Sequence, residues 1–409
     1  MVKPDYDILI IGGGLVGASL ACALRHSSLR IGVIEAVPLA GVTQSNQDER
    51  SLTLAYGSKL IFESLGLWPA VAGEANPIER IHISDRGRFG FTRLSAADAG
   101  LPALGYVIPQ RVLGVELIKL VKTADNDNIE WMCPASMQAI QFMPGYACVT
   151  IAYQGAEKIL NTRLVVAADG AHSAVRQAVG IDAVRTEYRQ SAIVTSVNVS
   201  LAHRNIAYER FTETGPLALL PLASGRCGVV WSVSEKQAAT MLAWSDAEFL
   251  NHLQEHFGDR LGAFSQVAKR MAYPLALTRV PQQVRHRLAL IGNAAHTVHP
   301  VAGQGFNLGL RDVAALAEII SDAKHTGDDI GDLRILRRYA SWRERDNRVT
   351  STFTDGLIRV FSNRFAPLAW ARNVGLLAMD LMPPAKRRLI RVTSGLSGRL
   401  PRLTRGLPL

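Results

Sequence analysis

A glycine-rich turn near the start of the chain constrains the fold more than any other sequence feature. Residues 5–11 are a short apolar run typical of a buried strand, and Gly12, Gly14 and Gly17 follow with the spacing G-x-G-x-x-G. The first glycine permits a tight turn, the second lets a pyrophosphate approach the backbone, and the third lets a helix pack against the strand. The sequence therefore predicts a Rossmann-like α/β fold that binds a dinucleotide.

The acidic residue Glu35 supports this prediction. A helix over residues 15–26 and a buried strand over residues 29–35 complete a βαβ unit, and Glu35 ends that second strand. A carboxylate at this position accepts hydrogen bonds from ribose hydroxyls and repels a 2′-phosphate. The expected dinucleotide is therefore FAD or NAD rather than NADP.

Two further glycine-containing segments follow predicted buried strands. The segment 169–176, DGAHSAVR, follows a strand at 163–169, and either a plain strand end with an Asp cap or a ligand site explains it. The segment that starts at Gly292 follows a strand at 287–292 and continues to residues 300–307, PVAGQGFN. We expect a tight bend there, whose backbone N–H groups at the start of a helix stabilise an anion.

The composition is that of an ordinary globular protein. Of the 409 residues, 48% are hydrophobic and 20% charged, which is compatible with two or three domains. The four cysteines form no C-x-x-C pair and no cluster with histidines at metal spacing, so we expect reduced thiols and no metal site. Residues 8–24 lack charges over nearly the length of a membrane span, but their glycines favour a strand-turn-helix. We expect no signal peptide, because the first residues are charged.

The rest of the chain predicts alternating helical and strand-rich regions. We expect helices at 51–66, at 111–121 and from 305 onward, short strands within 78–110 and 190–235, and a hairpin over 137–153 that turns at Pro144-Gly145.

Three segments together resemble the fingerprints of one enzyme family. GGGLVG at 12–17, DGAHSAVR at 169–176 and GNAAHTVHPVAGQGFNLGLRD at 292–312 resemble those of the FAD-dependent aromatic hydroxylases related to p-hydroxybenzoate hydroxylase. The resemblance runs in order over nearly the whole chain. Four more segments resemble the ubiquinone-biosynthesis hydroxylases of that family: DERSLTLAYGS at 48–58, ISDRGRFGFTRL at 83–94, LGYVIPQ at 104–110 and ERFTETGPLALLPL at 209–222.

This resemblance implies a Rossmann-like FAD-binding domain interleaved with a β-sheet substrate domain, plus a helical C-terminal segment. The expected FAD-binding domain comprises residues 1–77, 110–182 and 277–350. The expected substrate domain comprises residues 78–109 and 183–276, and residues 351–409 form the helical C-terminal region with a basic tail.

The resemblance also implies which residues bind FAD. The expected cofactor-binding residues are Gly12, Gly14 and Gly17 at the pyrophosphate, Glu35 at the ribose, Arg50 and Arg111 near the flavin, Asp169, Asn293, and Pro300, Gly303, Gly305 and Asn307 around the isoalloxazine. The family usually has Gly-Asp where this chain has Gly292-Asn293. Asn keeps the hydrogen-bonding capacity and loses the charge, so we expect FAD to be retained, and an Asn here favours the branch that acts on polyprenylated methoxyphenols.

The implied reaction is a flavin hydroxylation. NAD(P)H or another electron donor reduces FAD, O2 adds at flavin C4a, and the hydroperoxide transfers one oxygen to an electron-rich ring. Because the cofactor performs this chemistry, no side chain is assigned as catalytic, and the loop of Pro300, Gly303 and Gly305 is the expected catalytic element. His296 and His299 are expected to form hydrogen bonds in this loop, and the sequence identifies no base for a phenol.

The implied substrate is a polyprenylated phenol, 2-polyprenyl-6-methoxyphenol, in ubiquinone biosynthesis. Two alternatives remain at this point: a flavin hydroxylase for another aromatic substrate, and a flavoprotein scaffold of the same biosynthetic complex. The halogenase signature W-x-W-x-I-P is absent from the sequence.

The charge of the chain is concentrated at its C-terminal end. The net charge is +10, and residues 351–409 hold ten Lys and Arg against two Asp. This region predicts either a helix packed on the body with a solvated basic tail, or a peripheral contact with anionic lipid or with other ubiquinone-biosynthesis proteins. Nucleic acid is not expected, because no binding motif accompanies the charge. The expected location is cytoplasmic, with peripheral contact to the inner membrane.

Overall fold

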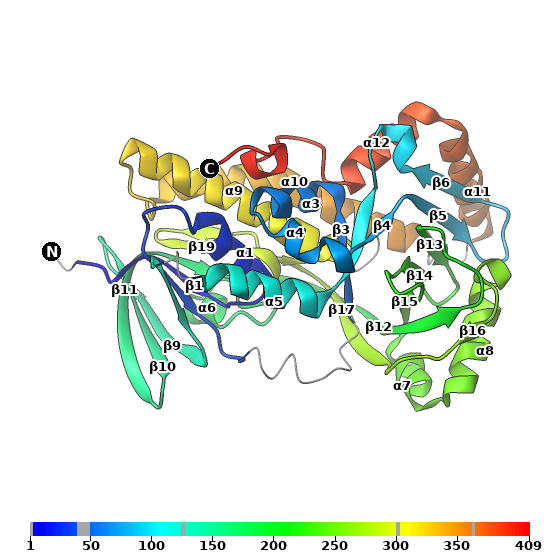
Figure 1. The fold of residues 1–409 in the computed structure, drawn as a ribbon, viewed down its shortest axis with the longest axis horizontal. Helices are drawn as coiled ribbons and strands as arrows, with labels where there is room; N and C mark the ends of the chain where they lie inside the picture. Colours follow the sequence, from blue (N-terminus) through cyan, green and yellow to red (C-terminus); the bar gives the residue numbers. More distant parts are fainter. Residues whose placement is uncertain (1–2, 39–49, 124–126, 300–302, 362–364) are drawn as a thin grey trace.

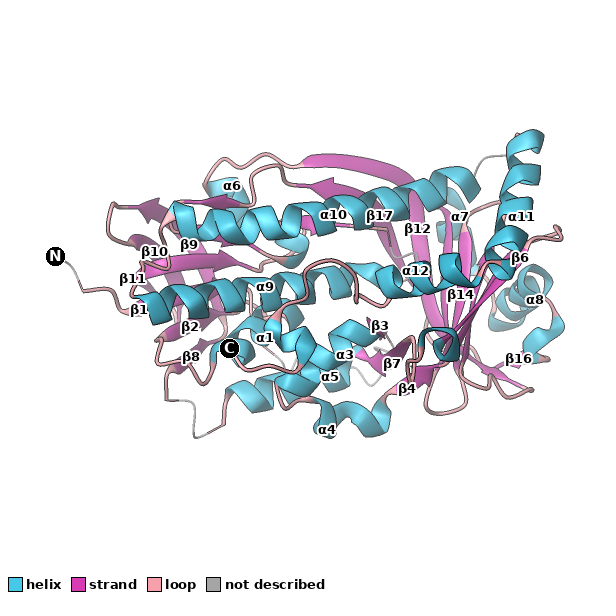
Figure 2. Cartoon of the chain, turned by 90° about the horizontal axis from the view of Figure 1, so that it is seen from above, coloured by secondary structure: helices cyan, strands magenta, loops and turns pink. Residues whose placement is uncertain are grey.

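Two large β-sheets lie beside each other, and two long helices run across them (Figures 1 and 2). The computed structural model describes residues 3–38, 50–123, 127–299, 303–361 and 365–409. The long helices are α9 (Gln304–Thr326) and α10 (Leu333–Phe361).

The first sheet has a parallel centre, as the βαβ pattern predicts. Its order is β18-β19-β11-β1-β2-β8, with β10 and β9 added beyond β11, and β1 pairs in parallel with both β2 and β11. Its strands are β1 (Tyr6–Ile11), β2 (Ile31–Ile34), β8 (Ile129–Met132), β9 (Ala135–Phe142), β10 (Ala147–Tyr153), β11 (Ala156–Ala167), β18 (Val284–Arg285) and β19 (Leu288–Leu290). The hairpin expected over residues 137–153 is confirmed by the antiparallel pairing of β9 with β10.

The two faces of this sheet have different covers because side chains alternate along each strand. Ile8 and Ile10 of β1 pack with residues of α1 (Leu15–Leu24), α5 (Gln110–Val121) and α9, whereas Leu9 packs with residues of β9–β11 and with Val175 of α6 (Ala174–Ala178). The expected helices at 15–26 and 111–121 are therefore confirmed, and both belong to the dinucleotide-binding part.

The second sheet is mostly antiparallel and follows the order β20-β17-β12-β15-β14-β13-β5-β6, with β16 paired to β12. Its strands are β5 (Arg80–Asp85), β6 (Phe91–Ser95), β12 (Val184–Val199), β13 (Ile206–Phe211), β14 (Pro216–Pro221), β15 (Cys227–Ser234), β16 (Phe264–Ser265), β17 (Met271–Arg279) and β20 (His296–Thr297). Helices α7 (Glu235–Ala243) and α8 (Asp246–Phe257) pack on one face through Met241, Phe249 and Leu253.

A small third sheet joins the two large ones and corrects one prediction. Its order is β3-β7-β4, made of β3 (Ser51–Ala55), β7 (Gly105–Pro109) and β4 (Asn76–Ile78). We expected a helix over all of residues 51–66, but α3 covers Tyr56–Ser64 alone, followed by α4 (Trp68–Val71). Residues 51–55 are a strand because they pair antiparallel with residues 105–109, a partner that local periodicity does not reveal.

The C-terminal region is helical, as expected, but its basic end is not a solvated tail. Helices α11 (Ala366–Leu381) and α12 (Pro383–Thr393) lie against β5 and β6 (Figure 1). Beyond α12, Leu403 is buried, Gly57 N–H donates to Ser394 O at 2.8 Å, and Arg402 pairs with Asp322 at 2.5 Å. The basic side chains thus alternate with residues that anchor the segment to the dinucleotide-binding part. Among the described helices, none is long and apolar enough to cross a bilayer.

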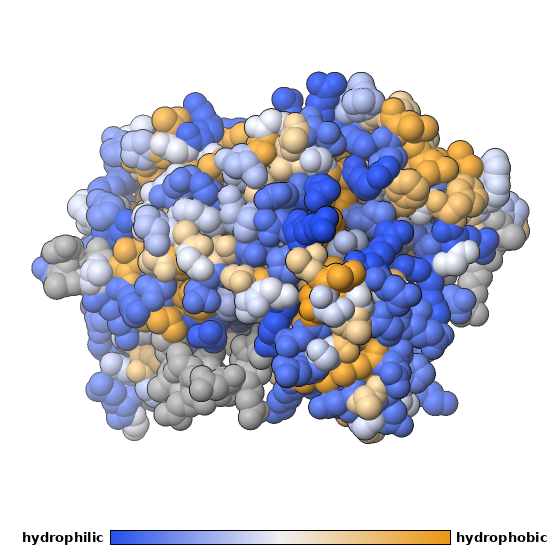
Figure 3. Space-filling view, turned by 45° about the vertical axis from the view of Figure 1, so that its right-hand side comes forward, coloured by the Kyte–Doolittle hydropathy of each residue, from blue (hydrophilic) through white to orange (hydrophobic). Residues whose placement is uncertain are grey.

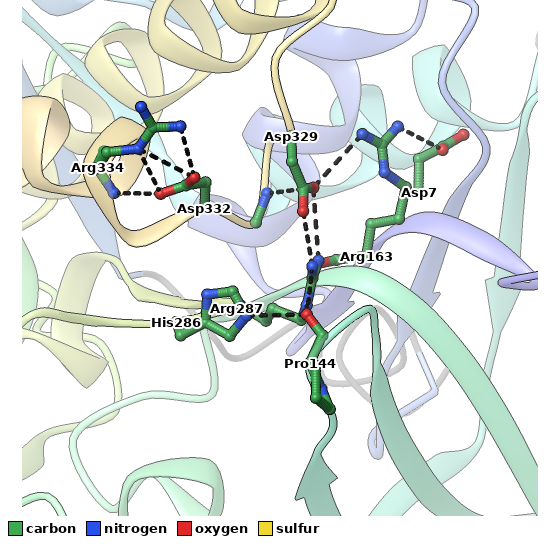
Figure 4. A network of polar contacts seen from close by, with 9 residues as sticks. Asp7, Pro144, Arg163, His286, Arg287, Asp329, Asp332 and Arg334 are labelled. Atoms are coloured by element: carbon green, nitrogen blue, oxygen red, sulfur yellow. Dashed lines mark hydrogen bonds and ion pairs between the residues drawn. The ribbon is translucent and has the colours of Figure 1, made fainter. Parts of the chain in front are cut away.

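An ionic network holds the amino ends of the central strands (Figure 4). Arg287 bonds Asp329 at 2.6 Å and donates to the carbonyl oxygens of Pro144 and Arg163, both at 2.9 Å. Arg163 also lies 3.4 Å from Asp7 of β1. Because these contacts lie at the amino ends of β1 and β19 and at the start of the segment of β11 that pairs with β1, they leave the opposite, carboxyl ends of the strands available for ligand binding.

Candidate active site

A cavity of about 990 Å³ brings the three glycine-containing segments together. Its wall includes Gly14 of the first segment, Gly170 of the second, and Gly292, Asn293, Gly303 and Gly305 of the third. These segments lie far apart in sequence and each follows a strand of the first sheet. The carboxyl edge of that sheet is therefore where the sequence-predicted cofactor residues meet.

The three glycines of the first turn have the different environments that the motif predicts. Gly12 adopts φ +101°, and a Cβ on Gly17 would lie 1.9 Å from the carbonyl oxygen of Gly12. A Cβ on Gly14 would meet nothing within 4 Å among the described residues. Gly12 and Gly17 are thus required by the protein's own packing, whereas Gly14 faces open space at the N-terminus of α1, where backbone N–H groups attract phosphate.

Glu35 stabilises this turn from the end of β2. Its carboxylate accepts hydrogen bonds from the N–H groups of Gly13 at 2.6 Å and Val37 at 2.8 Å. The carboxylate is therefore fixed beside the glycine turn, at the position where the motif places a ribose.

Asp169 forms the cap that was one of the two interpretations of its segment, and it leaves its other carboxylate oxygen without a partner among the described residues. One carboxylate oxygen caps α6 by accepting from the N–H of Val175 at 3.0 Å, while Oδ1 is buried and has no hydrogen-bond partner among the described residues. A buried acceptor without a partner is costly, so Oδ1 has one acceptor position to offer a ligand. The neighbouring Gly170 has open space where a Cβ would stand.

Arg176 links the second segment to the third, a role that the sequence did not reveal. Its guanidinium donates to the carbonyl oxygens of Ala171 at 2.8 Å and Ala294 at 2.9 Å. The arginine in the pattern DGAHSAVR indicated its presence at the site, but its partner in the third segment lies 118 residues away in the chain. Arg176 therefore positions the two loops relative to each other.

The third segment is anchored by a buried acid. Asp312 of α9 accepts from the N–H of Gly292 at 3.0 Å and bonds His296 Nε2 at 2.6 Å and Arg343 Nε at 2.8 Å. Burial disfavours the ionised carboxyl, but the charges of His296 and Arg343 outweigh burial and lower the pKa of Asp312 to about 2. His296 forms the loop hydrogen bond that was expected of it, and the side chain of Asn293 is exposed at the cavity.

His299 is buried in the same region. Its ring packs edge-on against Tyr188, with 5.3 Å between the ring centroids. Burial lowers the pKa of His299 to about 4, so the imidazole is neutral at neutral pH.

Asn307 connects the start of α9 to the small sheet. Its side chain accepts from Ala55 N–H at 2.8 Å and donates to the carbonyl oxygens of Thr53 at 2.8 Å and Gly303 at 2.6 Å. These bonds use the polar atoms of the side chain, so Asn307 holds the loop in place through the backbone. Pro300 lies outside the described residues.

Gly303 and Gly305 differ as Gly17 and Gly14 do. Gly303 adopts φ +62° at the start of α9, and a Cβ there would lie 2.7 Å from Thr53, whereas a Cβ on Gly305 would meet no described residue within 4 Å. Gly305 is therefore the position of this loop that leaves room for close approach by a ligand.

Arg50 and Arg111 flank the cavity. The N–H of Gln110 donates to Arg50 O at 2.8 Å, which places the two arginines at neighbouring ends of β3 and β7. Arg111 is exposed, and the Arg50 guanidinium lies 5.7 Å from the centroid of the Tyr273 ring. Their neighbours Ser51 and Gln110 line the cavity directly.

The rest of the cavity wall is mostly apolar and comes largely from the second sheet and the C-terminal helices. Its apolar residues include Ile81, Ile83, Phe211 and Leu220 from the sheet and Leu357, Phe361, Leu376 and Met379 from α10 and α11. Arg372 of α11 also lines the cavity and pairs with Asp85 at 2.8 Å. One acidic residue, Glu209 of β13, lies within this apolar part, and the sequence prediction did not single it out.

The described residues fit a bound FAD. Gly14, Gly170 and Gly305 each leave open space where a side chain would stand, and Asp169 Oδ1 is a buried acceptor without a partner. The N-terminus of α1 offers backbone donors for a pyrophosphate. When bound, FAD supplies the redox and oxygen-transfer chemistry, while this chain orients the flavin and excludes water from it.

Comparisons with known proteins identify the family. Residues 5–345 match the family model described as "FAD binding domain". The chain is 37% identical over 406 residues to "Ubiquinone hydroxylase UbiL" of Rhodospirillum rubrum, covering 98% of this chain and 93% of the relative. It is 32% identical over 398 residues to "3-demethoxyubiquinol 3-hydroxylase" of Escherichia coli, covering 97% of this chain and all of the relative.

Solved structures show the same fold. The crystal structure of p-nitrophenol 4-monooxygenase from Pseudomonas putida aligns with a TM-score of 0.80 at 17% identity, covering 97% of this chain and all of that chain. The expected α/β fold is thereby confirmed. With the family match and the two relatives, it follows that this chain is an FAD-dependent aromatic monooxygenase and belongs to the ubiquinone-biosynthesis hydroxylase family.

Proposed function

We propose that the protein hydroxylates the ring of a polyprenylated phenol, 2-polyprenyl-6-methoxyphenol, in ubiquinone biosynthesis. The observation that supports this proposal is the cavity, which continues from the glycine loops into an apolar compartment lined by Ile83, Phe211, Leu376 and Met379. A small polar phenol does not need so much apolar surface, whereas a prenyl chain gains free energy from each methylene that it buries there.

The names of the relatives favour a prenylated ring and leave its substitution pattern open. The Escherichia coli relative is named for hydroxylation of 3-demethoxyubiquinol. A demethoxyubiquinol is therefore the second candidate substrate, because it carries the same kind of prenyl chain on a ring with hydroxyl groups.

We propose the following division of roles around FAD. Gly14 and Gly305 allow the pyrophosphate and the flavin to approach the backbone, Glu35 binds a ribose, and Asp169 and Asn293 hydrogen-bond the remainder of the cofactor. Gly12, Gly17, Gly303 and Asn307 shape the loops, and Arg50 and Arg111 contribute positive charge near the flavin. Pro300 keeps its expected place in the flavin loop as a prediction.

We also propose the domain boundaries given by the sequence: FAD binding by residues 1–77, 110–182 and 277–350, and substrate binding by residues 78–109 and 183–276. Residues 351–409 would then contribute to both, because Leu376 and Thr393 line the cavity. Electrons would come from NAD(P)H or another donor.

The outer surface of the C-terminal helices supports a proposal of peripheral contact with the cytoplasmic face of the inner membrane. Exposed apolar side chains gather there, namely Phe365, Trp370, Val374, Leu381 and Met382. Figure 3 shows hydrophobic atoms at the upper right, the side on which α11 lies in Figure 1. The exposed Arg387 and Arg388 of α12 add positive charge that attracts anionic lipid. Other ubiquinone-biosynthesis proteins are the alternative partners for this surface.

Metabolite profiling of a strain that lacks the gene tests the proposed substrate. Accumulation of 2-polyprenyl-6-methoxyphenol, cleared when the gene is restored, is the expected result. Accumulation of a demethoxyubiquinol would instead support the second candidate, and normal quinone levels without any prenylated intermediate would contradict both. Purified protein with 2-geranyl-6-methoxyphenol, NAD(P)H and O2 should give a product heavier by one oxygen in mass spectrometry.

A further inference from the structure

One acidic side chain interrupts the apolar wall of the cavity. Paired residues form a row across β5, β13, β14 and β15, in the order Ile83, Glu209, Ala218 and Val230. All four line the cavity. Directly paired residues of neighbouring strands face the same side of a sheet, so Glu209 lies between Ile83 and Ala218 on the cavity side.

The alternation of β13 fixes this orientation. The side chains of Tyr208 and Arg210 contact α8 on the opposite face, where Tyr208 lies edge-on to Phe257 and Arg210 Nη1 donates to Phe257 O at 2.6 Å, and Tyr208 also borders the cavity. Ala207 and Phe211 share the cavity face with Glu209. Since residues i and i+2 of a strand point the same way, Glu209 cannot leave the cavity without disrupting the strand.

Glu209 has neither a hydrogen bond nor an ion pair with the described residues. The other charged or titratable groups that the structure places on the cavity wall are His172, Tyr208, Arg185 from β12 and Arg372 from α11, and Arg372 is paired with Asp85. Burial alone raises the pKa of Glu209 to about 7. A half-buried carboxyl that has no partner and lies among apolar side chains disfavours folding, so its presence points to a ligand that supplies the partner.

We propose that Glu209 is the residue that binds the ring hydroxyl of the phenolic substrate and accepts its proton. This inference rests on the proposed function in requiring a ring that carries a hydroxyl group. In the step, the substrate O–H bond breaks, an O–H bond to the Glu209 carboxylate forms, and the electron pair stays on the phenol oxygen. That pair delocalises into the ring and makes a ring carbon more nucleophilic toward the oxygen that the flavin delivers.

The environment of Glu209 suits both parts of this role. The apolar neighbours Ile83, Ala218 and Val230 exclude competing water, which strengthens a hydrogen bond between the carboxylate and a hydroxyl. A carboxyl that titrates near neutral pH is also a stronger base toward a phenol than an ordinary surface glutamate. The prenyl chain would extend over the apolar residues of the same wall.

The test compares Glu209→Gln and Glu209→Asp with Glu213→Gln, a matched control at an exposed glutamate of the β13–β14 turn. Wild type is first assayed by product mass spectrometry against a panel of prenylated and unprenylated phenols, and the variants are assayed with the phenol that turns over fastest. Flavin content is measured in each protein so that loss of FAD is not mistaken for loss of the base.

We expect Glu209→Gln to retain FAD and to lower kcat by about 10²–10⁴-fold, the usual contribution of general base catalysis. The wild-type rate should rise with pH through about 7, that rise should disappear in Glu209→Gln, and Glu209→Asp should keep it at a lower rate. An unchanged kcat and pH profile in Glu209→Gln would overturn the inference. If wild type turns over only phenols that lack a prenyl chain, the proposed substrate is refuted and the Glu209 test remains valid. If wild type turns over no phenol at all, both the proposed substrate and the role of Glu209 are refuted.

Discussion

The Nε2 atom of His296 lies 2.6 Å from Oδ2 of Asp312, and both side chains are buried. The pair joins the loop that follows β19 to the third turn of α9. Because the same carboxylate also binds Gly292 N–H and Arg343, one acid sets the position of the third glycine-containing segment.

Replacing Asp312 with Asn should therefore reduce both stability and FAD affinity. The substitution removes one of the two counter-charges of the buried Arg343 guanidinium, which also pairs with Asp346, and should cost about 1–3 kcal/mol in unfolding free energy. Denaturant unfolding and flavin content measure the two effects. Asp322→Asn on the same helix is the control, because Asp322 pairs with Arg402 nearer the surface. Equal losses in both variants would contradict a specific role for Asp312.

The pKa of Asp312 also predicts how this contribution depends on pH. Its folded value of about 2 lies below the ordinary 3.8, so the stabilisation is present above pH 4 and is lost as the pH falls toward 2. Between pH 4 and pH 2, the stability of wild type should approach that of Asp312→Asn.

Gly14→Val should abolish FAD binding without unfolding the apoprotein. A side chain at Gly14 meets open space in the protein but occupies the place expected for the pyrophosphate. The absorbance ratio of flavin to protein should fall to near zero, while the melting temperature of the apoprotein stays close to that of wild type. Gly73→Val, at an exposed glycine with equally open surroundings, should keep its flavin. A Gly14→Val protein with full flavin content would refute the cofactor assignment.

Gly17→Ala, in contrast to Gly14→Val, should destabilise the apoprotein. Its Cβ would collide with Gly12 O, so the backbone must shift even when no cofactor is bound, at a cost of about 1–3 kcal/mol. The apoprotein should melt at a lower temperature than wild type. An apoprotein as stable as wild type would mean that the turn relaxes more easily than the geometry indicates.

Arg287→Met should destabilise the fold while leaving FAD affinity unchanged. The guanidinium joins Asp329 to two backbone carbonyls at the amino ends of the strands, and its removal should cost about 2–4 kcal/mol. Chemical unfolding and flavin titration separate the two effects. Arg334→Met, at an exposed arginine of the same network, should change stability little (Figure 4). Loss of flavin affinity in Arg287→Met would show that the two edges of the sheet are coupled.

Glu209→Gln should be more stable than wild type at pH 8 and nearly equal to it at pH 4.5. The folded pKa of about 7 exceeds the ordinary 4.5, so the unfolded chain ionises first, and wild type loses stability as the pH rises through about 7. Glutamine does not titrate, and the difference should reach about 2–3 kcal/mol. Unfolding curves of both proteins across this pH range measure the difference in stability. A difference that does not change with pH would mean that the Glu209 carboxylate has a charge partner in solution.

The sequence predicted the parts of the site that depend on local pattern. The strand, glycine turn and helix at residues 6–24 follow from a short apolar run and its glycines, and the family follows from three such segments in order. Each of these patterns extends over about twenty residues of sequence. It can therefore be recognised without knowing which distant residues it contacts.

The features that the sequence mispredicted or did not reveal depend on contacts between residues that are far apart in the chain. Residues 51–55 form a strand because they pair with residues 105–109, and Arg176 reaches a carbonyl 118 residues away. Glu209 begins ERFTETGPLALLPL, one of the segments that resemble the ubiquinone-biosynthesis hydroxylases. Its isolation among apolar residues becomes visible after Ile83, Ala218 and Val230 are aligned beside it. The alternation of Ala207, Glu209 and Phe211 was the signal that could have identified it.

The position of Ser394 beside Gly57 has a consequence for biosynthesis. Residues 389–394 complete a wall whose opposite side contains β3, and they leave the ribosome long after β3 does. Throughout that interval the apolar side chains of the cavity wall in the nascent protein are exposed to solvent, where they can associate with other nascent chains. Slow translation of the C-terminal segment should therefore increase the demand for chaperones. Early supply of FAD should reduce this demand by stabilising the dinucleotide-binding part that has already been synthesised.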